Sequence, residues 1–369
     1  MHDTPQQQSS DALQATLENF RSRIQAASAQ RTPLQIRGAG TKDWYGQTLQ
    51  GELLDTRAYR GIVDYEPTEL VITARCGTPL AEIDAALAQH NQMLAWEPPR
   101  FGGISTVGGM VAAGLSGPAR QSAGSVRDFV LGAVLMDAQG QVLHFGGQVM
   151  KNVAGYDVSR LLTASLGTLG LILEVSLKVL PRPFASNTRV FEVDQENAIR
   201  LLNEWGGQPL PLTASAWVNN VLTIRLAGAQ AAVDSAIRKL GGSELSNGDD
   251  FWRDLREQTH AFFAQPEQAL WRLSLPSTTP ALGLPGRQLI EWGGAQRWLR
   301  PDDGSHGDAV AIRAAAIQAG GHASLHRGGD KSIGVFHPLQ PAVERIHRRL
   351  KAEFDPAGIF NPGRMYAGL

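Results

Sequence analysis

Residues 102–117 read GGISTVGGMVAAGLSG, and this stretch decides more about the fold than any other part of the chain. Between Thr106 and Gly117 it predicts a short helix built from small residues, namely Gly108, Gly109, Ala112, Ala113 and Gly114. A glycine inside a helix costs up to about 1 kcal/mol relative to alanine, so the run calls for a compensating close approach. Either a bound ligand or a neighbouring backbone satisfies that requirement. Thr106 is placed to cap the helix, which would direct its positive end at a diphosphate.

A second glycine segment lies upstream, where RGAGTK (37–42) follows a short apolar strand at 34–37. A strand that breaks into Gly-x-Gly-Thr presents successive backbone N–H groups as a concave nest for phosphate oxygens. Thr41 adds a hydroxyl donor. An ordinary tight turn explains the glycines as well, and the segment is neither a P-loop nor a GxGxxG fingerprint.

A third segment, SLGTLGLILEV (165–175), opens from a glycine turn into a strand expected over 169–179. Ser165, Gly167 and Gly170 flank that turn, and a dinucleotide ring can lie along such a strand edge. Upstream, Lys151, Asp157 and Arg160 are either functional or a solvated, ion-paired set; the sequence leaves both open.

The elements expected up to Val179 alternate irregularly, which favours α+β over a regular doubly wound sheet. We expect a helix over 11–29, a strand over 69–74, a helix capped by Thr78 with Pro79 at its first position, a hairpin of strands 128–137 and 141–145, and a helix over 156–165.

Pro181-Arg182-Pro183 marks the expected boundary to a second domain with an antiparallel sheet and helices on one face. Asn219-Asn220 predicts a hairpin. The expected strands are 188–193, 213–218, 221–226, 269–275, 288–292, 296–300 and 333–337, and the expected helices 195–204, 229–240, 251–263, 308–319 and 340–354. The last helix places Val343, Ile346 and Leu350 on its apolar face. The domains predicted are therefore 1–183, 184–339 and 340–369.

Composition excludes several classes of protein. The 369 residues carry a formal net charge of −1, which offers no basic field for nucleic acid. A single cysteine, Cys76, excludes an internal disulfide and a cysteine-built metal site. No N-terminal signal pattern and no apolar run of about 20 residues is present, so we expect a cytoplasmic protein that reaches the inner membrane only peripherally, through partners.

The four segments RGAGTK, TVGGMVAAGLSG, GSVRDFVLG and GYDVSRLLTASLGTLGLILEV, in this order, resemble the vanillyl-alcohol-oxidase/PCMH-type FAD-binding domain over roughly residues 30–180. The resemblance implies a two-part FAD-binding domain, a smaller cap domain and a C-terminal segment that returns to the FAD domain. In that family the first loop holds the pyrophosphate, the second glycine stretch completes the diphosphate and flavin cradle, and the turn before the last strand contacts the adenine side.

More closely, EPPRFGG, AAGLSGPAR, FGGQVMKNVAGYDVSRL and FDPAGIFNPGRMY resemble the FAD-binding E subunits of bacterial glycolate oxidases, almost from end to end. Carried over residue by residue, the resemblance places FAD binding on Arg37, Gly38, Ala39, Gly40, Thr41, Lys42, Thr106, Gly108, Gly109, Gly114, Ser116, Gly117, Gly124, Asp128, Gly170 and Ile172, with Asn361 and Arg364 returning to the flavin domain.

The chain departs from its relatives in two places. Flavinylated relatives carry a histidine in the first loop where this chain has Thr41, so we expect a non-covalent, dissociable FAD. Catalytic D-2-hydroxyacid relatives carry a His-x-Gly-Asp-Gly-Asn-type metal and substrate motif in the cap. Here GHASLHRGGDKSIGVFHP (321–338) lacks it, which speaks against independent turnover and against a metal.

Hydride transfer from a hydroxy acid needs a base for the hydroxyl proton and a cation for the carboxylate. The weak candidates are His322, His326 and Arg327. On a strand, the two histidines would share a face because they are four residues apart. Surface or interface histidines are the alternative. The tryptophans at 205, 217, 252, 271, 292 and 298 are core residues or anchors for a partner.

Three functions follow as hypotheses. The resemblance implies an FAD subunit of a glycolate oxidase or dehydrogenase complex, which oxidises glycolate, or a related 2-hydroxy acid such as D-lactate, to glyoxylate. Its partners would be a catalytic FAD subunit and an iron–sulfur subunit that takes the electrons, since one cysteine cannot ligate a cluster. An autonomous FAD-dependent 2-hydroxy acid dehydrogenase and a non-catalytic flavin-bearing assembly subunit are the alternatives.

Overall fold

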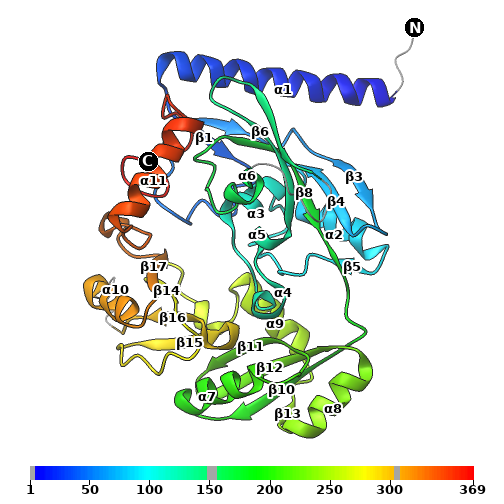
Figure 1. The fold of residues 1–369 in the computed structure, drawn as a ribbon, viewed down its shortest axis with the longest axis vertical. Helices are drawn as coiled ribbons and strands as arrows, with labels where there is room; N and C mark the ends of the chain where they lie inside the picture. The colour runs from blue at the N-terminus through cyan, green and yellow to red at the C-terminus, as the bar shows by residue number, and fades with distance from the viewer. Residues whose placement is uncertain (1–4, 148–155, 303–307) are drawn as a thin grey trace.

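The computed structural model describes residues 5–147, 156–302 and 308–369. Figure 1 shows two lobes. We call the upper one, which contains β1–β9 and α1–α6, the N-terminal lobe, and the lower one, which contains β10–β17 and α7–α10, the cap lobe. The last helix, α11 (Pro341–Phe354), leads the chain from the cap lobe back to the N-terminal lobe. The mixture of helices and antiparallel sheets confirms the α+β class.

A five-stranded antiparallel sheet organises the N-terminal lobe, in the order β3-β4-β8-β6-β7. Its core consists of apolar side chains from these strands and from helices on one face, among them Ile83, Leu87, Val111 and Leu135. The strands are β3 (Ile62–Glu66), β4 (Val71–Arg75), β6 (Val130–Met136), β7 (Val142–Gly146) and β8 (Leu171–Lys178). The remaining elements are α1 (Pro5–Gln30), α2 (Leu80–Ala88), α3 (Val107–Ala113), α4 (Arg120–Ala123), α5 (Val126–Phe129), α6 (Val158–Leu161), β5 (Gln92–Met93) and β9 (Leu180–Pro181).

A small parallel pair, β1 (Leu34–Arg37) and β2 (Glu52–Asp55), lies beside this sheet. The C-terminal segment joins it on the other edge of β1. The backbone N–H of Leu34 donates to the carbonyl of Ile359 at 2.7 Å, and the N–H of Asn361 donates to the carbonyl of Leu34 at 3.0 Å. The backbone of β1 therefore lies hydrogen-bonded beside that of residues 359–361, although the two segments are far apart in the sequence.

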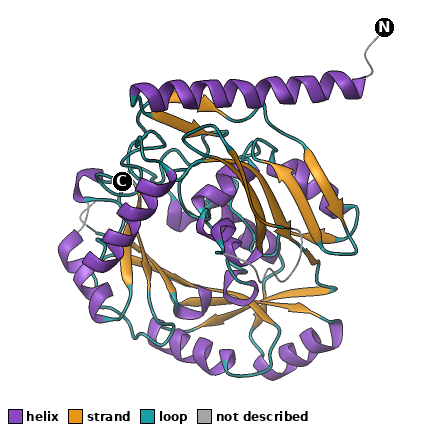
Figure 2. Ribbon diagram, turned by 45° about the horizontal axis from the view of Figure 1, so that its top comes forward, coloured by secondary structure: helices purple, strands orange, loops and turns teal. Residues whose placement is uncertain are grey.

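The cap lobe is one continuous eight-stranded antiparallel sheet in the order β13-β10-β12-β11-β15-β16-β14-β17. Its helices lie on the side away from the N-terminal lobe (Figure 2), except the helix over Gly248–Glu257, which packs on the other face of the sheet and contacts the N-terminal lobe through Glu257. The strands are β10 (Ala185–Glu192), β11 (Leu212–Val218), β12 (Val221–Gly228), β13 (Ser243–Glu244), β14 (Leu270–Ser274), β15 (Arg287–Glu291), β16 (Gln296–Arg300) and β17 (His322–Arg327). The helices are α7 (Gln195–Gly206), α8 (Gln230–Leu240), α9 (Gly248–Glu257) and α10 (Ala309–Gln318). The hairpin at Asn219-Asn220 is confirmed, with φ of 52° and 60°.

Three local expectations are wrong. Residues 333–337 form no strand; Gly334 turns at φ 80° after a 3₁₀ turn over Lys331–Ile333, and the edge strand is β17. Thr78 does not cap α2, because its hydroxyl bonds the N–H and carbonyl of Gly61, and Pro79 holds the cap position.

The apolar face of α11 is also not a core face. Val343 is 41% exposed and Ile346 is 57% exposed, because the helix crosses the molecular surface on its way back to the N-terminal lobe. Hydrophobic spacing alone does not reveal whether another element covers the helix.

Candidate functional site

The glycine segments converge on two adjacent cavities in the N-terminal lobe. The first encloses about 520 Å³ and is lined by the RGAGTK loop, by Ser105 and Thr106, and by residues of α3. The second encloses about 380 Å³ and runs toward Gly170 and Ile172 at the start of β8. The two cavities share lining residues and so form one passage, which we call the interloop channel; the shared residues are Ile36, Gly38, Gly109, Ala112, Leu166 and Asn361.

The loop over residues 38–42 offers backbone donors to this channel. Within the described residues, the N–H groups of Ala39, Gly40, Thr41 and Lys42 have no acceptor. Gly40 turns the chain at φ 74°, and a Cβ there would lie 2.2 Å from the Arg37 guanidinium. Consecutive free N–H groups around a left-handed glycine form a nest that suits phosphate oxygens. The phosphate interpretation of this loop therefore fits its geometry.

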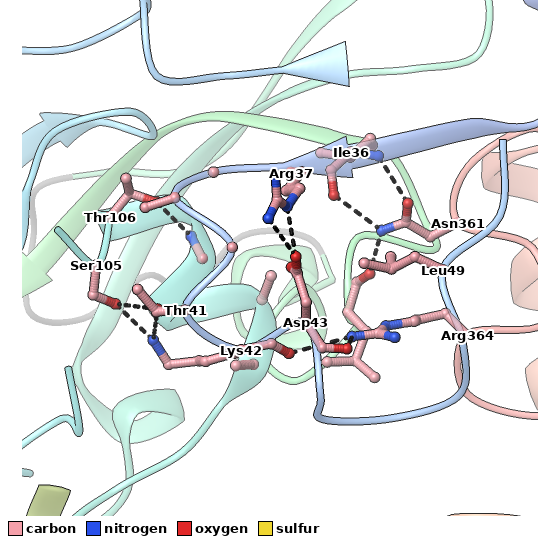
Figure 3. A pocket seen from close by; sticks show the side chains of 17 residues that line it. Ile36, Arg37, Thr41, Lys42, Asp43, Leu49, Ser105, Thr106, Asn361 and Arg364 are labelled. Carbon is pink, nitrogen blue, oxygen red and sulfur yellow. Dashed lines mark hydrogen bonds and ion pairs between the residues drawn. The ribbon is translucent and has the colours of Figure 1, made fainter. Parts of the chain in front are cut away.

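Lys42 adds a positive charge to the loop. Its Nζ donates to Ser105 Oγ at 2.6 Å, and no carboxylate lies within ion-pairing distance of it in the described part of the chain (Figure 3). Burial lowers the pKa of Lys42 to about 8, and the nearby Arg100 lowers it further while Glu257 opposes the shift. A half-buried ammonium group without an ion pair favours an anion in the channel.

Arg37 behaves differently from Lys42. Its guanidinium pairs with Asp43, with 2.7 Å between Arg37 Nε and Asp43 Oδ2 (Figure 3). The pair holds the two ends of the loop together, so the charge of Arg37 is already balanced. We assign Arg37 a part in shaping the loop.

Thr106 caps α3 as expected, since its Oγ1 accepts from the N–H of Gly109 at 3.3 Å. The positive end of the helix is nevertheless not free for a ligand. The N–H of Val107 donates to Thr78 and the N–H of Gly108 donates to Cys76, at 2.9 and 2.8 Å. The donors available to an anion thus come from the 38–42 loop and not from the helix.

Close protein packing explains several of the glycines. A Cβ on Gly38 would lie 2.4 Å from Thr106 Oγ1, and one on Gly108 would lie 2.7 Å from the Cβ of Cys76. Gly109 is different, because a Cβ there would meet only Thr106 Oγ1, at 3.2 Å, and the residue lines both cavities. Close packing against Cys76 therefore explains why residue 108 is a glycine, whereas Gly109 borders the open channel.

The C-terminal segment closes the channel. Asn361 Oδ1 accepts from the N–H of Ile36 at 2.8 Å, and its Nδ2 donates to the carbonyl of Leu166 at 2.7 Å. Arg364 donates to the carbonyls of Lys42 and Asp43 (Figure 3). Burial lowers the pKa of Arg364 to about 10. These contacts fix the loop, β1 and the turn before β8 relative to one another.

The structure brings most of the expected cofactor residues into the interloop channel but not all of them. Those that line it are Arg37, Gly38, Ala39, Gly40, Thr41, Lys42, Thr106, Gly108, Gly109, Gly170, Ile172, Asn361 and Arg364. Ser116 and Gly117 line a third cavity, between the lobes.

Gly114, Gly124 and Asp128 have structural roles in this arrangement. Gly114 ends α3 at φ 66° against Ala164, and Gly124 turns at φ 101°. The carboxylate of Asp128 accepts from the N–H and hydroxyl of Ser125 in a capping box. Asp157 and Arg160 pair at 3.3 Å, while Lys151 lies outside the described residues.

The candidate catalytic residues separate. They lie on one strand, β17, as supposed, but only His326 and Arg327 are in contact with Trp44 of the N-terminal lobe. His326 is buried, with its ring centroid 5.1 Å from that of Trp44, and the Arg327 guanidinium lies 4.0 Å from the Trp44 ring centroid. His322 is exposed and its ring is nearest His337, at 6.2 Å. The described residues contain no group of histidine, cysteine and carboxylate side chains that could hold a metal ion.

Several channel residues were not identified from the sequence. Ser105 holds Lys42, Asp43 pairs with Arg37, and Leu166 accepts from Asn361 through its carbonyl. Ser105 directly precedes the identified cap Thr106, which is a signal that could have found it. Leu166 acts through its backbone, so its side chain gives no signal.

Comparison with known proteins identifies relatives of this arrangement. Residues 12–146 match the family model of the FAD binding domain. The chain is 49% identical over 359 residues to the glycolate oxidase subunit GlcE of Escherichia coli (strain K12), covering 97% of this chain and 99% of that protein. It is 32% identical over 164 residues to the glycolate oxidase subunit GlcD of Bacillus subtilis (strain 168), covering 44% of this chain and 34% of that protein.

Among solved structures, p-cresol methylhydroxylase with substrate bound matches with a TM-score of 0.67 at 13% identity, covering 95% of this chain and 87% of that one. This likeness shows the fold alone, and it confirms the expected PCMH-type architecture. The interloop channel fits the FAD that the matched domain binds, because it combines free backbone donors, an unpaired ammonium group and glycine positions where a side chain would intrude.

Proposed function

This chain belongs to the family of GlcE subunits of glycolate oxidase, and on that premise we propose that it is the FAD-bearing subunit of a complex that oxidises glycolate, or a related 2-hydroxy acid such as D-lactate, to glyoxylate. The observation that carries the proposal is the unpaired, half-buried Lys42 beside four free N–H groups in a channel closed by Asn361. The protein is an FAD-dependent oxidoreductase subunit.

The 38–42 loop and Lys42 would hold the linked phosphates of FAD, and Gly170 and Ile172 would line the end of the channel toward β8. When bound, FAD supplies the acceptor for a hydride. Thr41 stands where flavinylated relatives carry a histidine, and no histidine or cysteine stands within the 38–42 loop, so we propose a non-covalent FAD.

The proposed division of labour follows the lobes. Residues 1–183, with 340–369, form the cofactor-binding part, and residues 184–339 form the cap that meets substrate or partner. Of the three candidate catalytic residues, His326 and Arg327 are favoured over His322 because they contact Trp44 beside the 38–42 loop. The residues 5–147, 156–302 and 308–369 include no helix long and apolar enough to cross a bilayer.

With one cysteine this chain cannot ligate an iron–sulfur cluster, so in the proposed complex the cluster belongs to another protein. We propose a catalytic FAD subunit and an iron–sulfur subunit as partners, with any membrane contact made through them. The absence of the His-x-Gly-Asp-Gly-Asn-type motif favours this reading over an autonomous dehydrogenase. A flavin-bearing subunit required only for assembly is the remaining alternative.

One experiment separates the three. The absorbance of the bound flavin is recorded before and after glycolate, with the purified chain and with the reconstituted complex. We expect bleaching near 450 nm only in the complex, roughly one equivalent per flavin. Bleaching of the chain alone would support the autonomous enzyme, and a flavin of this chain that stays oxidised in an active complex would support the assembly role.

A further inference from the structure

A third cavity lies between the lobes and has a different character from the interloop channel. It spans about 320 Å³, open solvent at its mouth included, which is less than either cavity of the channel. The N-terminal lobe contributes Pro99, Ser116, Gly117 and Pro118. The cap lobe contributes mostly polar side chains, which we call the floor of the cavity. The floor residues are Arg256, Gln258, Arg272, Glu291, Gln296, Trp298 and His326.

Strand register brings this floor together. Arg272 on β14 is paired with Ser324 on β17 and with Trp298 on β16, and Gln296 is paired with Glu291 on β15. Residues directly opposite one another, and residues two apart on a strand, point to the same face of a sheet. Arg272, Glu291 and His326 therefore share one face of the sheet. The other face is apolar and is covered by α10.

Polar atoms of this cavity lack partners. Among the described residues, Nδ1 of His326 and Oε1 of Gln258 are buried without a hydrogen bond, although His326 Nε2 lies 3.0 Å from Gln258 Nε2. His326 is 2% exposed. Exchanging the two ends of the Gln258 amide still leaves one amide atom and Nδ1 unsatisfied. An unsatisfied buried polar group is costly, so a polar occupant is expected.

One of the two arginines of the cavity has no partner within the part of the chain that the structure describes. Arg256 is paired with Glu257 at 2.8 Å, whereas Arg272 has no ion pair or hydrogen bond in the described ranges. Glu291 is held by Trp298 Nε1 at 2.6 Å and by Gln296 Nε2 at 3.0 Å. Arg272 therefore stands as an uncompensated guanidinium beside orphaned acceptor and donor atoms, and guanidinium matches a carboxylate in geometry.

We propose that this cavity binds the carboxylate of a small organic acid on Arg272, with His326 and Gln258 bonding the acid's hydroxyl or carbonyl oxygen. The assignment rests on the proposed function and gives this chain its own acid-binding site, although the cap motif of the catalytic relatives is absent. Arg272 is the residue that fixes the acid, and the cavity's position against Ser116 and Gly117 sets the acid at the lobe interface.

The test uses oxalate, a two-carbon acid without a C–H bond, so binding is measured without turnover. Calorimetric titration of the FAD-loaded chain with oxalate should show binding, and Arg272→Gln should raise the dissociation constant by about tenfold or more, the loss expected for one charge-assisted contact. The control is Arg287→Gln, an exposed arginine on β15, which is separated from β14 by β16; this variant should stay within about twofold of the unaltered chain.

A second measurement needs no variant. The unaltered chain should bind glycolate and should fail to bind glycolamide, in which the carboxylate is replaced by a neutral amide. Equal affinity for the two, no oxalate binding by a fully FAD-loaded chain, or an unchanged dissociation constant for Arg272→Gln would each overturn the assignment. These outcomes are distinct from a failure of the proposed function, which would show as a chain that takes up no FAD.

Discussion

The side-chain amide of Asn361 donates a 2.7 Å hydrogen bond to the backbone carbonyl of Leu166, which lies 195 positions earlier in the sequence. The same side chain accepts from the N–H of Ile36. One residue thus joins β1, the turn before β8 and the C-terminal segment, all of which line the interloop channel.

Asn361→Ala should therefore weaken both stability and cofactor retention. It leaves the partly buried N–H of Ile36 and the buried carbonyl of Leu166 without these partners, which costs about 2–4 kcal/mol of unfolding free energy in urea titrations. Asn220→Ala is the matched control, because Asn220 has a similar backbone (φ 60°, against 40° for Asn361) but an exposed side chain. Equal destabilisation by both would assign the effect to the backbone and not to the bridge.

Gly38→Val should empty the protein of FAD while the cap lobe stays folded. The added Cβ would lie 2.4 Å from Thr106 Oγ1, so the loop must move away from α3. Gly103→Val is the control: nothing lies within 4 Å of a Cβ there. The flavin-to-protein absorbance ratio reports the result, with far-ultraviolet circular dichroism as the check on folding. Full occupancy in the Gly38 variant would show that the loop assignment is wrong.

FAD affinity should fall as pH rises, because Lys42 loses its charge above its pKa of about 8. Bound FAD favours the charged ammonium group and so raises the pKa of Lys42, which moves the fall in affinity to higher pH. The groups that act on Lys42 are Glu257, which favours its charged form, and Arg100, which opposes it. Lys42→Met should bind FAD about tenfold or more weakly at pH 7 and lose this dependence. Fluorescence titration across pH 6–10 measures both, and a variant with the same pH profile as the unaltered chain would contradict the role given to Lys42.

Glu291→Gln should flatten the pH dependence of stability. Burial, followed by the charge of Glu97, raises the pKa of Glu291 to about 7 from the usual 4.5, although Trp298 and Gln296 oppose the shift. Between about pH 4.5 and pH 7 the folded state keeps a proton on Glu291 that the unfolded state has released. The contribution of Glu291 to the free energy of unfolding is therefore fully present below about pH 4.5. It is lost as pH rises to about 7, by roughly 3 kcal/mol in all.

The relevant charges around Glu291 are Arg256, Arg272 and His326 across the cavity and Glu97 from the N-terminal lobe. Burial, followed by the charges of Arg272 and Arg327, lowers the pKa of His326 well below its usual value. Urea titrations at pH 5 and pH 8 should differ less for the variant than for the unaltered chain. If stability changes equally between pH 5 and pH 8 in the variant and in the unaltered chain, a group other than Glu291 is responsible.

Denaturation should release the flavin. Thr41 offers no imidazole in the first loop, so FAD is expected in the supernatant after acid precipitation of the protein. Thr41→His tests whether the position alone is enough for attachment. A yellow precipitate from the unaltered chain would contradict the non-covalent assignment.

Local signals explain which parts of this structure could be predicted. The cap at Thr106, the hairpin at Asn219-Asn220 and strand β16 depend on residues close in sequence, and all three are confirmed. The loop glycines were found because left-handed turns select glycine, as at Gly40.

The rest depends on long-range register. Arg272, Glu291 and His326 meet only because β14 pairs with both β16 and β17, and no local pattern encodes that order of strands. The same limit misplaced a strand at 333–337, where the apolar residues contact the sheet without joining it as a strand. The bonding of the α3 N–H groups to Thr78 and Cys76 was likewise invisible in sequence.

The seating of residues 359–361 alongside β1 has a consequence for biogenesis. During synthesis on the ribosome the N-terminal lobe emerges long before residues 359–361, so the flavin site stays unfinished until these residues have been made. Cofactor loading must then wait for this segment, and products that terminate before it would be colourless even though most of their core is present.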